Sequence, residues 1–313
     1  MKRWQAILLG VLISAATLYY ALHGVAWDQL GDVLAHGNYI FVVPAALLAA
    51  LGLGLRGYLA TRLQPPISIF TALSSVVVER LLDVLVVVVF IVLAILMAPV
   101  APEIAATAKI SGVLTVVGIV VLTAFAARRS LAHAVLDVIL RVIPALERFN
   151  LHGLLDRLLD GIAPLGSLRG ALTAFGWTSI AWFASVLSTY VLLYTFFDKP
   201  QINAALLLTA AASLAIAIPA MPGNIGPFEA AVIFGLTTSG LVLATNPQQQ
   251  ASALAYAVLL HIINIALYVV LGMLGLSQEH VSLGEVLRSA RQLAARSPDK
   301  SDKIDPAPDG ATL

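Results

Sequence analysis

Glu79, Arg80 and Asp83 are the first candidates for chemistry, because they lie inside a long apolar run, "VVVERLLDVLVVVV", at residues 76–89. Ionisable side chains are costly inside a lipid bilayer, so they are usually paired and face the protein interior. Glu79 and Asp83 are four residues apart and share one helical face, and Arg80 is close enough to pair with Asp83. Such a cluster could hold a cationic lipid headgroup or relay a proton. A structural ion-pair network, or a cluster wetted at the cytoplasmic interface, remains the alternative.

The second candidate is the stretch "PAMPGNIGPFEAA", residues 219–231, which interrupts the most apolar third of the chain. Its prolines remove helix hydrogen bonds, and its glycines allow a tight backbone. Pro227 is suited to the first turn of a new helix, where the helix dipole favours the carboxylate of Glu229. The candidate residues of a substrate pathway at this break are Pro222, Gly223, Asn224, Gly226 and Glu229.

The break can be interpreted in two ways. It could be an ordinary cytoplasmic turn in which Glu229 caps a helix. However, no Lys or Arg occurs between Lys199 and Arg288, whereas cytoplasmic loops are usually basic. The flanking apolar segments, 202–218 and 228–244, are about 17 residues each, which is the minimum for a span. We therefore favour a broken or re-entrant hairpin, since irregular backbone is tolerated at membrane depth where it lines a cavity.

A third signal is "LLHIINIALY", residues 259–268, where His261 and Asn264 lie three residues apart in an apolar run. Residues of this kind commonly make hydrogen bonds between membrane helices. A direct role of His261 in binding a ligand or a proton is the alternative.

The composition defines the elements that must position these residues. The chain has 313 residues, of which 60% are hydrophobic and 11% charged, and its mean hydropathy is +0.94. These values, with several runs longer than about 18 apolar residues, predict an all-α polytopic membrane protein with about 6–8 transmembrane helices. The expected spans lie near 4–22, 39–57, 70–98, 110–127, 171–197, 202–218, 228–244 and 250–276.

The basic residues predict that both termini are cytoplasmic. If the spans alternate, only Lys109 and Lys199 of the 18 Lys and Arg residues lie on the opposite side, with Arg80 inside a span. The basic residues assigned to the cytoplasmic side are Lys2, Arg3, Arg56, Arg62, Arg128, Arg129, Arg141, Arg148, Arg157, Arg169, Arg288, Arg291, Arg296, Lys300 and Lys303. The expected location is the plasma membrane, which is the inner membrane of a cell that has two.

Two segments are not expected to span the membrane. In residues 130–168, apolar residues recur every three or four positions among charged ones, which predicts cytoplasmic interfacial helices or helices packed on the spans. After the transmembrane domain, 1–280, residues 281–313 are expected to form a short amphipathic helix and a disordered cytoplasmic tail. "SLGE" at 282–285 has the pattern of a capping box at the start of that helix.

The three candidate stretches together resemble a known family. "ERLLD" at 79–83, "PAMPGNIGPFE" at 219–229 and "HIINIALYVVLG" at 261–272 are similar to the membrane domain of lysylphosphatidylglycerol synthases, which also occurs as stand-alone flippase-like proteins. The resemblance covers most of residues 1–280. It implies translocation of phospholipid or lipid-linked headgroups, including aminoacylated phosphatidylglycerol, with a separate enzyme making the lipid.

The chain departs from the family pattern before the Glu-Arg motif. The family has a further stretch there, with an asparagine, a proline and a Gly-Glu pair ahead of an arginine. Here residues 51–83 run almost directly from the second span into the motif, and "RGYLATRL" at 56–63 looks like the end of the missing element. A helical hairpin is therefore expected to be absent, which bears on whether the transport cavity is complete and active.

The remaining functional classes are constrained by motifs. The chain has no cysteine, no P-loop, no nucleophile elbow and no metal-ligand spacing, so we expect no cofactor or metal and favour a role other than catalysis. A net charge of +1 gives no reason to expect a nucleic-acid partner. The expected partners are membrane lipids. A lipid-modifying membrane enzyme using Glu79, Asp83 and His261, or a scaffold subunit of a lipid or cell-envelope synthesis complex, is the alternative.

Overall fold

The structure is a computed structural model that describes residues 3–61, 69–97, 123–143, 151–216 and 222–278, with single positions elsewhere. Every regular element in these residues is a helix, and no strand occurs among them. This confirms the all-α class. Several predictions fall outside the described residues, namely those on Pro219, on Lys109, on 282–285 as a capping box and on the tail.

The chain divides into two compact units, Met1–Leu267 and Tyr268–Leu313, and the division falls inside the last long helix. The helices in chain order are α1 (Arg3–Leu22), α2 (Trp27–His36), η1 (Tyr39–Phe41), α3 (Val42–Thr61), α4 (Ile69–Met97), α6 (Arg129–Val142), α7 (Leu151–Ile162), η3 (Ala163–Gly166), α8 (Leu168–Leu193), α9 (Ile202–Ala215), η4 (Pro222–Asn224), α10 (Pro227–Thr238) and α11 (Pro247–Gln278). The predicted boundary near residue 280 lies outside the described residues.

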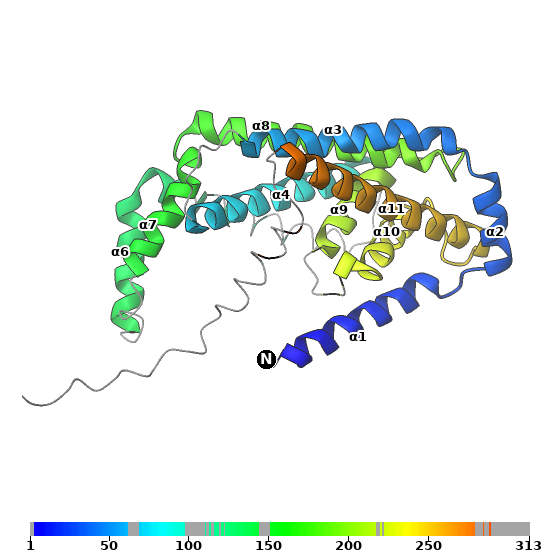
Figure 1. Ribbon diagram of the computed structural model, residues 1–313, viewed down its shortest axis with the longest axis horizontal. Helices are drawn as coiled ribbons and strands as arrows, with labels where there is room; N and C mark the ends of the chain where they lie inside the picture. The colour runs from blue at the N-terminus through cyan, green and yellow to red at the C-terminus, as the bar shows by residue number, and fades with distance from the viewer. Residues whose placement is uncertain are drawn as a thin grey trace, which may run out of the picture. The chain divides into compact units, whose positions relative to one another are not determined.

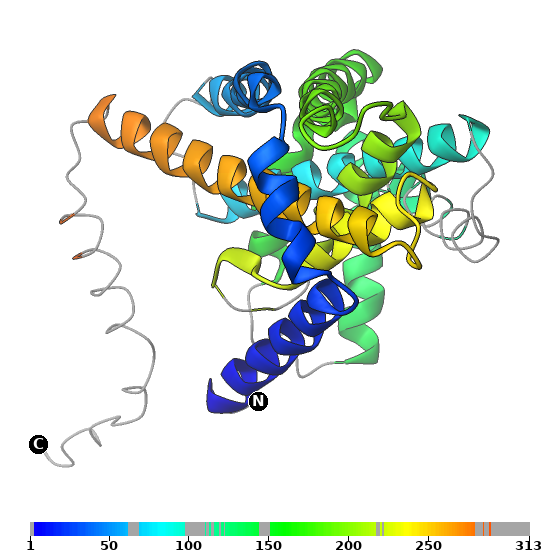
Figure 2. The same ribbon diagram turned by 90° about the vertical axis from the view of Figure 1, so that its right-hand side faces the viewer.

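Two of the described helices, within Leu168–Leu193 and Pro247–Gly275, are by themselves long and apolar enough to cross a membrane. A third candidate is the bent pair Leu8–Leu22 and Trp27–His36, whose two parts meet at 78°. Figure 2 shows α1 and α2 meeting at this corner. Other apolar helices are shorter, so fewer single helices pass this test than the spans predicted from the sequence. The protein is a polytopic helical membrane protein, in which part of the membrane domain is built from broken helices.

The predicted interruption of the chain is present as a hairpin of two short helices, α9 and α10. They have 14 and 12 residues, or about 21 and 18 Å at 1.5 Å per residue, less than the ~30 Å hydrocarbon core. They pack tightly, since a Cβ placed on Gly235 would lie 2.5 Å from Cα of Leu208. Most side chains of both helices are buried, as expected for helices that are apolar all round. These dimensions agree with the expected broken or re-entrant hairpin.

The core of the first unit surrounds α9. Helices α3 and α8 run side by side (Figure 1), and α9 packs against both α8 and α4. A chain of polar contacts crosses this apolar core. The hydroxyl of Tyr256 donates to the carbonyl of Thr189 at 2.9 Å, and the hydroxyls of Thr189 and Thr209 are 3.0 Å apart. These contacts fix the register of α8, α9 and α11.

Helices α6 and α7 form the segment predicted to be interfacial. Both are amphipathic and pack on each other, and α7 also packs against α4. Helix α7 therefore packs on another helix of the first unit, while the interfacial position of residues 130–168 stays a prediction. In α6, Val138 and Val142 are exposed while Leu140 is buried, so the helix keeps an apolar outer face.

Candidate functional site

The structure joins two residues that the sequence analysis treated as separate signals. Oε1 of Glu229, in the first turn of α10, lies 2.5 Å from Nδ1 of His261 on α11. Both residues are buried, with 6% and 8% of their surface exposed. The ring of Phe228 lies over the imidazole, with a 4.4 Å separation of ring centroids. A carboxylate and an imidazole in this geometry can hold one proton between them, which suits them to proton transfer or acid–base chemistry.

Glu229 also closes the helix break. Its second carboxylate oxygen, Oε2, accepts the backbone N–H of Gly226 at 2.7 Å, so the side chain completes a capping box at the start of α10. The cap that was the ordinary interpretation of Glu229 is therefore present, together with the contact to His261. Both carboxylate oxygens have partners within the protein. A cationic headgroup that bound to Glu229 would therefore compete with His261.

The break itself is held in an unusual backbone conformation. Gly223, Asn224 and Gly226 have φ angles of 83°, 56° and 100°, in the left-handed region that favours glycine. A Cβ on Gly226 would lie 2.5 Å from the carbonyl oxygen of Ser14 and 2.7 Å from the hydroxyl of Thr17, both on α1. The two glycines are thus required by conformation, and Gly226 also by the close approach of α1.

An apolar pocket of about 410 Å³ opens beside the break. Its walls come from α1, α2, α11 and the segment that joins η4 to α10, with aromatic side chains from α2 and from near the end of α8. The lining residues are Leu18, Leu22, Trp27, Leu30, Leu34, Tyr39, Phe196, Ile225, Glu229, Leu254, Ala255, Val258, Leu259 and Ile262. Among the described residues of this wall, Glu229 is the one ionisable side chain apart from the phenol of Tyr39. The volume lies in the range typical of small-molecule and cofactor sites.

The Glu-Arg-x-x-Asp cluster is divided between the interior and the surface. Asp83 is buried, and its Oδ1 accepts the indole N–H of Trp182 at 2.6 Å. Arg80 reaches Asp83 at 3.2 Å and Glu79 at 3.5 Å, but the side chains of Arg80 and Glu79 are 63% and 48% exposed. The expected pairing is present, whereas the expectation of a fully buried network holds for Asp83 alone.

If this cluster and Glu229 lay on one substrate pathway, they would be expected to face each other across one cavity. Among the described residues that line the pocket, none comes from α4. The pocket beside Glu229 is therefore bounded by α1, α2 and α11, and the expected opposing polar surface is not part of it. The reason is that Asp83 points instead toward α8, where Trp182 supplies a buried hydrogen-bond donor.

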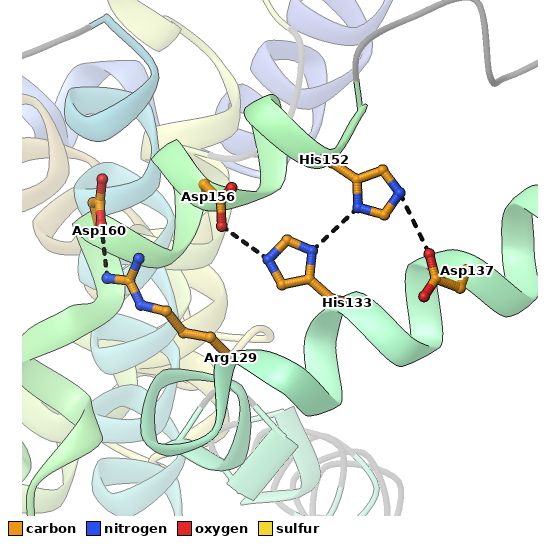
Figure 3. A network of polar contacts seen from close by, with 6 residues as sticks. All are labelled: Arg129, His133, Asp137, His152, Asp156 and Asp160. Carbon is orange, nitrogen blue, oxygen red and sulfur yellow. Dashed lines mark hydrogen bonds and ion pairs between the residues drawn. The ribbon is translucent and has the colours of Figure 1, made fainter.

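A further polar network lies between α6 and α7 (Figure 3). Nδ1 of His133 faces Nδ1 of His152 at 3.2 Å, and each Nε2 lies beside a carboxylate, of Asp156 at 2.8 Å and of Asp137 at 3.3 Å. The sequence analysis did not single out these residues, although the four-residue spacing of His133 from Asp137 and of His152 from Asp156 could have indicated two polar helix faces. No group of three His, Cys, Asp or Glu side chains in the described part of the chain is arranged to hold a metal ion.

Trp182 and the pocket aromatics are the other functional candidates that sequence reasoning missed. Nothing in an apolar helix marks which indole will meet a buried carboxylate 99 residues away. The signal that was available is the general one that a buried Trp needs an acceptor.

The fold and the site define a polytopic membrane protein in which a broken helical hairpin carries a buried acid–base pair beside an apolar pocket. The chain matches the family described as the lysylphosphatidylglycerol synthase TM region over residues 55–272, which is more than half of its length, and it belongs to that family. The resemblance seen in the three sequence stretches is thereby confirmed. Comparisons with curated proteins and with solved structures find no match.

Membership of this family makes the chain a membrane protein related to lipid modification or transport. The departure noted in the sequence lies at the start of the matched region. Helix α3 ends at Thr61 and α4 begins at Ile69, so the connection is too short for the additional hairpin of the family pattern.

Proposed function

We propose that the protein moves phospholipid or lipid-linked headgroups, aminoacylated phosphatidylglycerol among them, between the leaflets of the plasma membrane. The observation that carries the proposal is the apolar pocket beside the Glu229 break. A pocket walled by aliphatic and aromatic side chains fits hydrocarbon chains, and Glu229 with its helix N-terminus supplies polar groups at one point of the wall. Family membership supports a lipid as the substrate class.

The other pathway residues have defined places in this proposal. Gly223, which is exposed, and Asn224, which is half-buried, leave the backbone open to a headgroup at the break, whereas Gly226 is covered by α1. Arg80, with its exposed side chain, would interact with a lipid phosphate at the membrane surface. We place both termini and residues 130–168 in the cytoplasm, in keeping with the distribution of basic residues.

The test is movement of a fluorescent phosphatidylglycerol in liposomes that contain the purified protein. An impermeant reductant added outside bleaches only the probe in the outer leaflet, so movement appears as a second, slower loss of fluorescence. We expect this phase in protein-containing liposomes and its loss in Val258→Trp, which fills the pocket from α11. Ile265→Trp is the matched control, because Val258 and Ile265 lie on the same helix and are 40% and 43% exposed, and Ile265 does not line the pocket. The proposal would be refuted if the rate of lipid movement were the same in protein-free liposomes, with the parent protein and with both variants.

The Glu229–His261 contact also favours a second candidate, a lipid-modifying membrane enzyme, since a carboxylate beside an imidazole can act in general acid–base catalysis. Mass spectrometry of the lipids recovered from the same liposomes distinguishes the two. A changed headgroup would support the enzyme, and an unchanged lipid that has crossed the bilayer would support the transporter. Neither result, with a partner enzyme that co-purifies, would support a scaffold.

A further inference from the structure

The Glu229–His261 pair is isolated in the sequence. Between Lys199 and Glu279 the chain contains no other Asp, Glu, Lys, Arg or His. These two residues nevertheless meet, with Oε1 and Nδ1 2.5 Å apart, in the apolar core of the first unit. A single charge at such a place is costly, and pairing the only acid with the only base of this region lowers that cost.

The elements around the pair supply no further charge. The described side chains of α1 near the break are the hydroxyls of Ser14 and Thr17, and its two phenols, Tyr19 and Tyr20, are exposed. The residues of α9 carry no ionisable group. In the part of α11 that belongs to the first unit, the ionisable residue other than His261 is Tyr256, whose hydroxyl donates to a backbone carbonyl of α8.

The residues on the pocket side of the pair likewise add no buried charge. Tyr39 lines the pocket, and the acidic and basic residues of α2, Asp28, Asp32 and His36, are exposed. The pair is therefore the buried contact between an acid and a base in this described part of the protein.

Counting protons at the pair shows why its protonation state matters. One proton between Oε1 and Nδ1 satisfies both atoms, while Oε2 of Glu229 accepts the N–H of Gly226. With Nε2 of His261 also protonated, the pair is an imidazolium beside a carboxylate, and a further proton must reside on Oε1, where it would face the N–H of His261, or on Oε2, where it would weaken the bond from Gly226. Loss of one proton from the imidazolium leaves a neutral ring, which keeps the contact only as the tautomer with its hydrogen on Nδ1. Protonation of the carboxylate therefore breaks one of the two contacts of Glu229, whereas loss of a proton from the ring removes the charge that strengthens the contact with His261.

These contacts reach the pocket wall. Gly226 packs directly on α1 at Ser14, and its neighbour Ile225 lines the pocket together with Leu18 and Leu22 of α1. Releasing the cap at Gly226 would move Ile225 relative to α1. We propose that proton binding and release at the Glu229–His261 pair opens and closes this pocket, so that a proton gradient drives the lipid movement proposed above. This inference rests on the proposed function for the identity of the cargo, a lipid, whereas the proton switch itself does not depend on that function.

The first experiment repeats the liposome assay with a fluorescent phosphatidylglycerol under an imposed pH difference, without one, and with a protonophore. We expect the gradient to accelerate movement and the protonophore to abolish the acceleration. Glu229→Gln should lose the response to the gradient, because an amide can still accept from Gly226 and donate to His261 but does not titrate. Asp28→Asn is the matched control, since it removes an exposed carboxylate of α2 and should keep the response. If Glu229→Gln does not fold, His261→Gln tests the same pair.

The second experiment needs no lipid movement. A spin label on Ile225→Cys, in this chain without other cysteines, reports mobility at the pocket wall in detergent as pH is varied. We expect a pH-dependent change that disappears when Glu229→Gln is added. If the rate of lipid movement does not depend on the pH gradient and the mobility of the label does not depend on pH, the proton switch is overturned but the proposed transport function is not. A pH-dependent label with no lipid movement would overturn the transporter and keep the switch.

Discussion

Gly226 shows how strongly a single residue determines the site. Its φ of 100° is unfavourable for any residue with a side chain, and a Cβ there would lie 2.5 Å from the carbonyl oxygen of Ser14. We expect Gly226→Ala to destabilise the protein by on the order of 2 kcal/mol, from backbone strain and displacement of α1. The apparent melting temperature in detergent, followed by size-exclusion chromatography after heating, measures the effect.

The control for that change is Gly176→Ala, because Gly176 lies inside α8 and a Cβ there would meet no atom within 4 Å. Alanine is favoured over glycine in a helix by about 1 kcal/mol, so this variant should be as stable as the parent or slightly more so. Equal melting temperatures for both variants would contradict the strained turn described at Gly226.

At the residue scale, the sequence identified the members of the site better than their partners. Glu229 and His261 were each singled out because an ionisable residue is rare in so apolar a region. Their contact could not be predicted, because it joins residues 32 positions apart across two helices and depends on how each helix is rotated. Asp83 was likewise identified, whereas its partner Trp182 was not.

At the scale of elements, the α6–α7 hairpin depends on a shared proton. Nε2 of His133 carries a hydrogen that donates to Asp156, and the 3.2 Å contact between the two Nδ1 atoms requires one hydrogen more. Nε2 of His152 forms an ion pair with Asp137 when its ring is protonated. The network in Figure 3 is therefore complete when the two rings together hold three protons. A fourth proton places two N–H groups against each other, and the loss of one removes either the hydrogen between the two Nδ1 atoms or the ion pair with Asp137.

Amide hydrogen exchange of α6 should follow these contacts. After correction for the intrinsic exchange rate, we expect His133→Ala to lower the protection of α6, because it removes the contacts to both His152 and Asp156. Asp160→Asn, which removes the neighbouring exposed ion pair with Arg129 at 2.7 Å, should lower protection less. Equal protection in the parent protein and in His133→Ala would contradict the network between the two helices.

The elements themselves follow from the sequence to different degrees. The interruption within 202–244 was predictable because three prolines and two glycines fall within residues 219–231, and a proline inside a helix removes a backbone hydrogen bond. The bend of 78° between α1 and α2 was not predicted, because the sequence analysis ended the first span at residue 22 and assigned no helix before residue 39. The φ of 79° at Gly24 fits the left-handed turn that separates the two helices.

For the whole molecule, the sequence was sufficient for class and family. Composition alone predicts a polytopic helical membrane protein, and three short stretches carry the family resemblance. The number of spans was less predictable, because apolarity does not distinguish a helix that crosses lipid from one buried by other helices. Helix α9 is the example, since ten of its 14 residues are buried by other parts of the protein.

The predicted sidedness can be tested on the whole protein in intact cells, using the absence of cysteine in the chain. We expect Lys199→Cys, in the exposed turn between α8 and α9, to react with a membrane-impermeant maleimide added outside. Arg128→Cys, in the exposed turn before α6, should react only after the membrane is opened. The reverse pattern would invert the orientation deduced from the basic residues.

The packing of α1 on Gly226 also sets an order of events during synthesis. Helix α1 enters the membrane long before the hairpin that it contacts has been made. At roughly 5–20 residues per second, the interval between Ser14 and Gly226 is on the order of 10–40 s. During that time the first helix must reside in the bilayer with its partner still on the ribosome. The pocket is therefore among the last parts of the membrane domain to form, and a chain that stops before α11 has no pocket.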